Sequence, residues 1–171
     1  MLISKPINDA LNQQIGNEFR ASLQYVAIAA YFEGEALQQL AGYFFRQADE
    51  EHEHAMRFVK FVLNAGGQVK IPEIESPACK FTSAKQAVKL SLDSELRVTD
   101  QINSLVHLAK TEKNYTTDNF LQWFVGEQLE EVSTMDNLLK VIERAGEDGL
   151  LRVEEYLARK GGSGAASSSV A

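Results

Sequence analysis

The stretch "ADEEHEHAMRF" (residues 48–58) places six titratable side chains in succession, Asp49 to His54, inside a segment that otherwise has the pattern of a buried helix. On a helix, residues three and four positions apart share a face. Glu51, His54 and Phe58 therefore lie on one stripe, whereas Glu53 points away from it. The stretch predicts a helix whose core-facing side carries a carboxylate and an imidazole.

The composition is that of one globular, helix-rich domain. The chain has 171 residues, of which 44% are hydrophobic, 24% charged and only 3 are proline. The single Cys79 excludes an internal disulfide and a C-x-x-C motif, and it favours a reducing, cytoplasmic location. We expect neither a secretory signal nor a membrane span, because the N-terminus lacks a cleavage pattern and no apolar run reaches about 18 residues.

The net charge of -7 bears on the kind of partner. Nucleic-acid binding requires a face rich in lysine and arginine, so the acidic balance argues against it. An acidic surface raises the local concentration of cations instead. Cations are therefore the expected ligands.

Helical periodicity predicts two long antiparallel helices, residues 6–34 and 37–65, joined by a tight turn. Pro6 suits a first turn, and the second helix stops at "NAGG". Residues 66–83 show no sustained period and are expected to be a long connection. Extended, this connection reaches about 60 Å, whereas a helix of this size is about 42 Å long. It can therefore cross the whole length of a bundle.

Two further long helices are expected from Ser83 or Thr82 to about residue 110, and over residues 117–144. A short fifth helix is predicted over residues 147–159. The fold class is thus all-α: a four-helix bundle with one long crossover between helices 2 and 3 and a short fifth helix. We expect this domain to cover residues 1–160 and residues 161–171 to form a flexible Gly/Ser/Ala tail.

Each of the four long helices has an apolar stripe that is interrupted near its middle by one acid. These acids are Glu18, Glu51, Glu95 and Glu131. Buried carboxylates cost several kcal/mol each without compensation, and no lysine or arginine lies in these stripes near them. A bound cation is therefore the simplest solution.

The donors indicate which metal is expected. Carboxylate oxygens with the imidazole of His54 suit iron or manganese better than the sulfur-rich sites of structural zinc, and two metals can share Glu51. A Glu-x-x-His pair alone is weak evidence for a metal site, whereas four acids in register on four helices are strong evidence. In the fourth helix, Gln128 and Glu131 replace a second Glu-x-x-His pair. Tyr25 is either a core tyrosine, a hydrogen-bond donor to the site or an electron donor.

Four segments, "NEFRASLQYVAIAAYF", "QADEEHEHAM", "SLDSELRVTDQI" and "NFLQWFVGEQLEEV", resemble the helices of bacterial non-haem ferritins. The resemblance covers roughly residues 6–158. It implies a subunit of a hollow 24-mer and a ferroxidase that oxidises Fe(II) with dioxygen or hydrogen peroxide. The ferric product is stored as a mineral in the cavity, and an unidentified reductase is the expected partner for its release.

The resemblance also implies a ligand set. One iron is assigned to Glu18, Glu51 and His54, and the second to Glu51, Glu95 and Glu131. Gln128 is expected to hydrogen-bond an oxygen species between them, and Tyr25 to lie close by. The residues that match a possible third iron site are Glu50, Glu127, Glu130 and Glu131.

Two alternatives stay open. A haem-containing bacterioferritin shares the fold, but it uses Glu-x-x-His on the fourth helix and a methionine where this chain has His52, so no haem is expected. A helical scaffold without chemistry is the second alternative. It leaves the burial of Glu18 and Glu95 without compensation.

Overall fold

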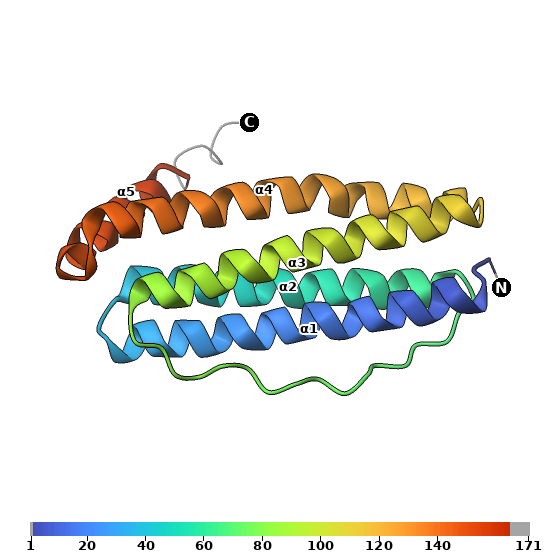
Figure 1. Cartoon of the computed structure of the whole chain (residues 1–171), viewed down its shortest axis with the longest axis horizontal. Helices are drawn as coiled ribbons and strands as arrows, with labels where there is room; N and C mark the ends of the chain where they lie inside the picture. Colours follow the sequence, from blue (N-terminus) through green and yellow to red (C-terminus); the bar gives the residue numbers. More distant parts are fainter. Residues whose placement is uncertain (1, 165–171) are drawn as a thin grey trace.

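The computed structural model describes the backbone of residues 2–164 and the side chains of residues 2–160. The helices are α1 (Lys5–Gly34), α2 (Gln38–Asn64), α3 (Ala84–Thr111), α4 (Tyr115–Ala145), a 3-10 turn η1 (Glu147–Gly149) and α5 (Leu150–Gly164). The predicted all-α bundle with one long crossover and a short fifth helix is confirmed (Figure 1). None of the helices in the described residues is long and apolar enough to cross a lipid bilayer.

Short polar side chains decide where α3 and α4 begin. The Ser83 hydroxyl accepts a hydrogen bond from the Gln86 amide at 3.1 Å, so α3 starts where it was expected. For α4 the prediction was slightly wrong, because the helix starts at Tyr115 and not near residue 117. The reason is Asn114, whose side chain accepts from the Thr117 amide at 3.0 Å and caps the helix earlier.

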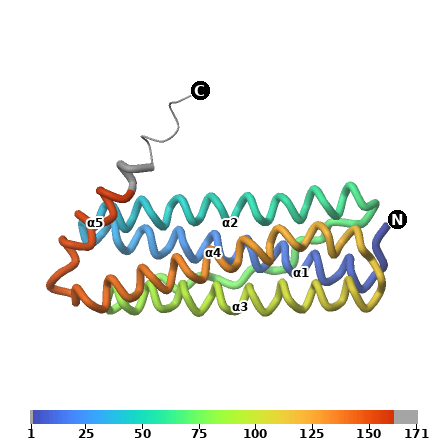
Figure 2. Tube along the Cα trace, turned by 90° about the horizontal axis from the view of Figure 1, so that it is seen from above, coloured from blue at the N-terminus to red at the C-terminus, as the bar shows by residue number. Residues whose placement is uncertain are grey.

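The crossover runs along the α1 side for the length of the bundle, and α3 then begins at the end opposite the N-terminus (Figure 1, Figure 2). Amide side chains of α1 hold its backbone in place. Gln24 exchanges two hydrogen bonds of 2.9 Å with the backbone of Ala78. Gly16 allows the closest approach, because a Cβ atom there would lie 2.4 Å from Cγ of Pro72.

The core consists of two apolar clusters separated along the bundle axis by a polar layer. One cluster contains Phe32 and Phe44, whose rings stack with centroids 5.6 Å apart. The other contains Phe58 and Phe124, with ring centroids 4.2 Å apart. The predicted acids of all four helices fall between these clusters, where the surrounding side chains are packed and water is largely excluded.

The C-terminal segment closes one end of the bundle. Val153 of α5 is buried in the core. Both oxygens of Glu154 accept hydrogen bonds from the first amides of α2, those of Gln39 and Leu40, at 2.7 and 2.9 Å. The backbone of α5 continues to Gly164, past the boundary expected at residue 160. The remainder of the predicted tail, 165–171, lies outside the described residues.

Candidate metal centre

Helices α1 and α2 bring three potential ligands together in the polar layer. Glu18 comes from α1, and Glu51 and His54 come from successive turns of α2. Their side chains are almost fully buried, with 1%, 2% and 4% of their surface exposed. One ligand atom of each lies within 4.8 Å of the others. A single ion could therefore touch all three.

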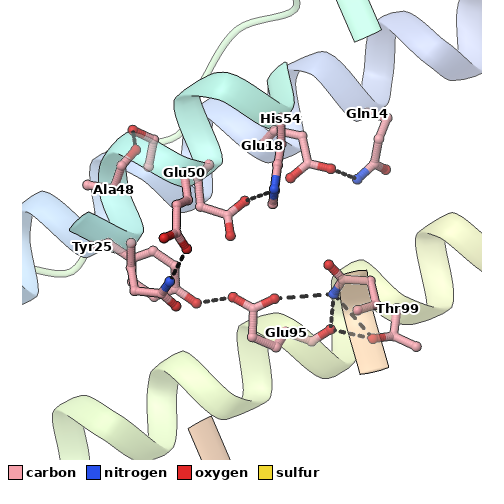
Figure 3. Close-up of polar contacts among 12 residues, drawn as sticks. Gln14, Glu18, Tyr25, Ala48, Glu50, His54, Glu95 and Thr99 are labelled. Carbon is pink, nitrogen blue, oxygen red and sulfur yellow. Dashed lines mark hydrogen bonds and ion pairs between the residues drawn. The ribbon is translucent and has the colours of Figure 1, made fainter. Parts of the chain in front are cut away.

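The two oxygens of the Glu18 carboxylate have different surroundings. Oε1 accepts a hydrogen bond of 2.8 Å from Nε2 of Gln14, one helical turn earlier on α1 (Figure 3). Oε2 is buried and accepts no hydrogen bond from an amide or hydroxyl group, and the carboxyl of Glu51 is a close polar neighbour of Glu18. A buried carboxylate oxygen without a partner is costly, so this atom is a natural ligand for a cation.

Helices α3 and α4 supply a second set of polar side chains with different contacts. Glu95 of α3 accepts hydrogen bonds from the Tyr25 hydroxyl and from the Gln128 amide (Figure 3). Gln128 Nε2 lies 3.2 Å from both Oε2 and the backbone oxygen of Glu95, and 3.3 Å from Oγ1 of Thr99. Glu95 is thus tethered on both carboxylate oxygens.

Glu131 completes the acidic layer from α4. Its pKa is raised to about 8 by burial and then by the negative charge of Glu95. Among the described residues, Glu18, Glu51 and His54 form a compact group of ligand atoms. Within the same set, Glu51, Glu95 and Glu131 do not form such a group. The second expected ligand set is therefore near the first, but more open.

The electrostatics of the layer show an excess of negative charge. Burial, followed by the charge of Glu51, raises the pKa of Glu18 well above its ordinary value, and burial followed by the charge of Glu95 does the same to Glu51. The pKa of Glu95 is raised by burial, although hydrogen bonds from Tyr25 oppose this. The ion pairs of lysine and arginine among residues 2–160 involve other acids. The layer favours either protonated carboxyl groups or a bound cation.

The acids expected at a third iron position lie at the margin of this layer. Glu50 has a pKa raised by burial, and the charge of Glu127 adds to this effect. Both also raise the pKa of Glu131, so these three side chains are near one another. Glu130 and His52 are exposed. His52 packs against the ring of Phe19, with centroids 5.5 Å apart, and is not part of the cluster.

Two side chains of the layer were not identified as site residues from the sequence. Gln14 is 2% exposed and lies four positions before Glu18, a spacing at which helical side chains meet, so this signal was available. Thr99 lies on the predicted α3 stripe, yet its contact with Gln128 joins α3 to α4. No spacing within one helix identifies such a contact.

The donor set fits a redox-active hard cation. It contains carboxylate oxygens, one imidazole and no thiolate, which suits iron or manganese. The Nδ1 atom of His54 lies 3.4 Å from Oε2 of Glu51. The His54 ring is further held edge-on by Trp123 and Phe124, at centroid distances of 5.4 and 5.8 Å. This packing orients the imidazole before an ion arrives.

Known proteins resemble this chain in sequence and in fold. The family model of the ferritin-like domain matches residues 8–145. The chain is 42% identical over 150 residues to Ferritin BfrB of Mycolicibacterium smegmatis, covering 88% of this chain and 82% of that protein. It is 33% identical over 147 residues to the bacterial non-heme ferritin of Staphylococcus aureus, covering 86% and 89%.

A solved structure is similar along almost the whole length. It is the open pore ferritin of the hyperthermophilic archaeon Archaeoglobus fulgidus, with a TM-score of 0.88, 35% identity and coverage of 91% of this chain and 96% of that one. The bundle, the crossover and the buried acids in register are thus found together with a matching family model and close relatives. The chain belongs to the ferritin family.

Proposed function

We propose that the protein stores and detoxifies iron as a ferroxidase. Fe(II) binds as substrate at two adjacent positions, one formed by Glu18, Glu51 and His54, the other by Glu51, Glu95 and Glu131. Each Fe(II) gives up one electron to dioxygen or hydrogen peroxide, and Fe(III) passes to a mineral inside a 24-subunit shell. Membership of the ferritin family supports iron storage.

The observation that carries the proposal is the buried oxygen Oε2 of Glu18, which has no hydrogen-bond partner. It lies in a group of three ligand side chains inside a layer whose acids have raised pKa values. A scaffold protein would gain stability from apolar side chains here. A metal ion is the compensation that also explains the imidazole.

The same ligands favour oxidation over simple binding. Anionic oxygen donors stabilise Fe(III) more than Fe(II), which lowers the reduction potential. The α3–α4 side contributes the neutral amide of Gln128 and the tethered Glu95, so it binds the product less tightly. This difference supports a turnover site that releases its product to storage.

Other side chains have supporting roles in this proposal. Tyr25, hydrogen-bonded to Glu95, is placed to orient that carboxylate and to supply an electron. In this proposal Gln128 turns one N–H, which contacts Glu95 and Thr99 in this structure, toward the oxidant. A third iron position, between the other two and the mineral, is proposed to be formed by Glu50, Glu127, Glu130 and Glu131.

Assembly into a shell is supported by apolar side chains that a single subunit leaves exposed. Leu23 and Val26 of α1 and Phe45 of α2 are 45%, 43% and 44% exposed. Leu129 of α4 is 75% exposed. Contact between subunits would bury such surface. A cytoplasmic location and the absence of haem stay predictions.

One experiment tests storage and assembly together. The metal-free protein is loaded anaerobically with Fe(II), exposed to air and run in a sedimentation velocity cell. We expect a large closed particle whose sedimentation coefficient increases with iron loading as the mineral forms. A stable monomer that forms no mineral contradicts the proposal.

A further inference from the structure

We infer that Gln14 is a positioning residue of the metal centre, an inference that rests on the proposed function. Its amide determines which oxygen of Glu18 faces the metal position formed with Glu51 and His54. Gln14 does not itself contact the metal in this arrangement. It acts through the carboxylate of Glu18.

The first argument is the hydrogen bond itself. Gln14 is 2% exposed, and its Nε2 lies 2.8 Å from Oε1 of Glu18 (Figure 3). When Glu18 binds a cation it is ionised and only accepts hydrogen bonds, so the amide then presents its nitrogen and not its oxygen. A hydrogen bond to a charged group in a buried site is stronger than one between neutral groups.

The second argument is that the amide cannot easily turn round. The Gln14 Oε1 atom accepts a hydrogen bond of 3.1 Å from Nδ2 of Asn17. If the Gln14 amide were flipped, its oxygen would face the Glu18 carboxylate and its nitrogen would face the nitrogen of Asn17. Both contacts would be repulsive. Asn17, whose own oxygen accepts a hydrogen bond of 3.4 Å from Nε2 of Gln13, therefore favours the orientation in which Gln14 donates to Glu18.

The third argument is that the hydrogen bond from Gln14 makes the two oxygens of Glu18 different. Oε1 is occupied by Gln14, whereas Oε2 is buried without a partner. The carboxylate is thus prepared to bind an ion through one oxygen, next to Glu51 and His54. Partners that orient a metal ligand in this way typically contribute about 10- to 100-fold to metal affinity.

The test uses the assembled, metal-free protein and Co(II) alone as the probe, titrated while its visible absorption is followed. In the wild type we expect two Co(II) ions per subunit, one bound more tightly than the other. Gln14→Met keeps the length of the side chain but removes the amide. We expect it to weaken the tighter step about 10- to 100-fold and to alter its absorption spectrum, while the weaker step is unchanged.

Three further variants separate positioning from a general structural effect. Gln38→Met makes the same change at an exposed position at the start of α2 and should leave both steps unchanged. Gln14→Glu, which places a second carboxylate against Glu18, should weaken the tighter step at least as much as Gln14→Met. In a Glu18→Gln background, Gln14→Met should have no further effect, because the carboxylate on which it acts is absent.

Each outcome is decisive. If wild-type protein binds no Co(II), the proposed metal centre itself is wrong. If the wild type binds two ions and Gln14→Met binds them with the same affinities and spectrum, only the role of Gln14 is overturned. The same holds if Gln14→Met weakens binding equally with and without the Glu18 carboxylate, since the effect would then be structural.

Discussion

The α1–α2 pair and the α3–α4 pair both place acids in the middle of the bundle, but they hold them differently. On α1–α2, Glu18 keeps one carboxylate oxygen without a partner beside a packed imidazole. On α3–α4, Glu95 is hydrogen-bonded on both oxygens. Gln128 and Glu131 stand where the first pair has Glu51 and His54. We therefore propose that the first half binds an ion tightly and that the second half shares and releases it.

The largest expected effect comes from the residue that belongs to both halves. Glu51→Gln keeps the shape of the side chain but removes a charged ligand from both metal positions. We expect the fast phase of Fe(II) oxidation, followed by stopped-flow absorbance, to slow by about 100-fold or more. The shell should still assemble, because an amide is less costly to bury than a carboxylate.

Glu53→Gln is the matched control for this change. Glu53 lies on the exposed face of the same helix, so its variant should oxidise Fe(II) at the wild-type rate. Equal rates for Glu51→Gln and wild type would show that the buried layer is not the ferroxidase centre.

A smaller effect is expected when only the α3–α4 half is disturbed. Gln128→Leu removes the hydrogen bonds that the Gln128 amide donates to Glu95 and to Thr99. Weaker binding at the second position alone should slow oxidation about 10-fold, the lower end for an outer-shell partner. Single-turnover kinetics at a fixed ratio of two Fe(II) per subunit would measure this.

Gln122→Leu makes the same substitution on the exposed face of α4, where Gln122 contacts Asp118 at 2.9 Å. It should leave the rate unchanged. If Gln128→Leu slows Fe(II) oxidation as much as Glu51→Gln does, the proposed difference between the two halves is wrong.

The pH dependence of stability provides a third test. The pKa of Glu131 is raised from 4.5 to about 8 in the folded protein. Between these values the folded state keeps a proton that the unfolded chain has released. The metal-free protein should therefore lose stability as the pH rises through this window, and Glu131→Gln should reduce the loss.

The measurement is the midpoint of thermal unfolding of the metal-free protein at several pH values between 5 and 9. Glu130→Gln, at an exposed neighbouring position, should follow the wild-type curve. If the unfolding midpoint of Glu131→Gln falls with rising pH as steeply as that of the wild type, Glu131 is not the group responsible.

The smallest expected effect lies at the end of the bundle, where the C-terminal segment caps one helix of each pair. Glu154 accepts from the first amides of α2, and Glu147 accepts from those of Ala84 and Lys85 at the start of α3, at 3.1 and 3.2 Å. Glu154→Ala should cost about 0.5–2 kcal/mol locally, as for other N-terminal caps. Hydrogen exchange of α5 and of the first turn of α2 should become faster.

The control for this change is Glu155→Ala. Glu155 is exposed and pairs only loosely, at 3.8 Å, with Arg159 of its own helix. Unchanged exchange in Glu154→Ala would mean that apolar packing around Val153 alone docks α5.

Much of the fold was predictable because it depends on local patterns. The period of three and four residues identified the long helices and the acids on their core faces. Ser83 marked the start of α3, whereas the cap of α4 at Asn114 was missed because "TEKNYTTDN" offers several capping residues within a few positions. The four acids and the histidine could be selected because each interrupts an apolar stripe.

The contacts between helices were not predictable in the same way. The clamp of Gln24 on the backbone of Ala78, the bond from Tyr25 to Glu95 and that from Gln128 to Thr99 join residues far apart in the chain. Periodicity gives the face on which a side chain lies, but not its partner on another helix.

By itself, the sequence determined that this chain forms a four-helix bundle and that acids of all four helices lie in one layer, because hydrophobic burial follows helical periodicity. Only the tertiary structure decided how that layer is divided. Hydrogen-bond partners in a packed core depend on distances of a few tenths of an ångström between helices. These distances left Oε2 of Glu18 without a partner while both oxygens of Glu95 were bonded.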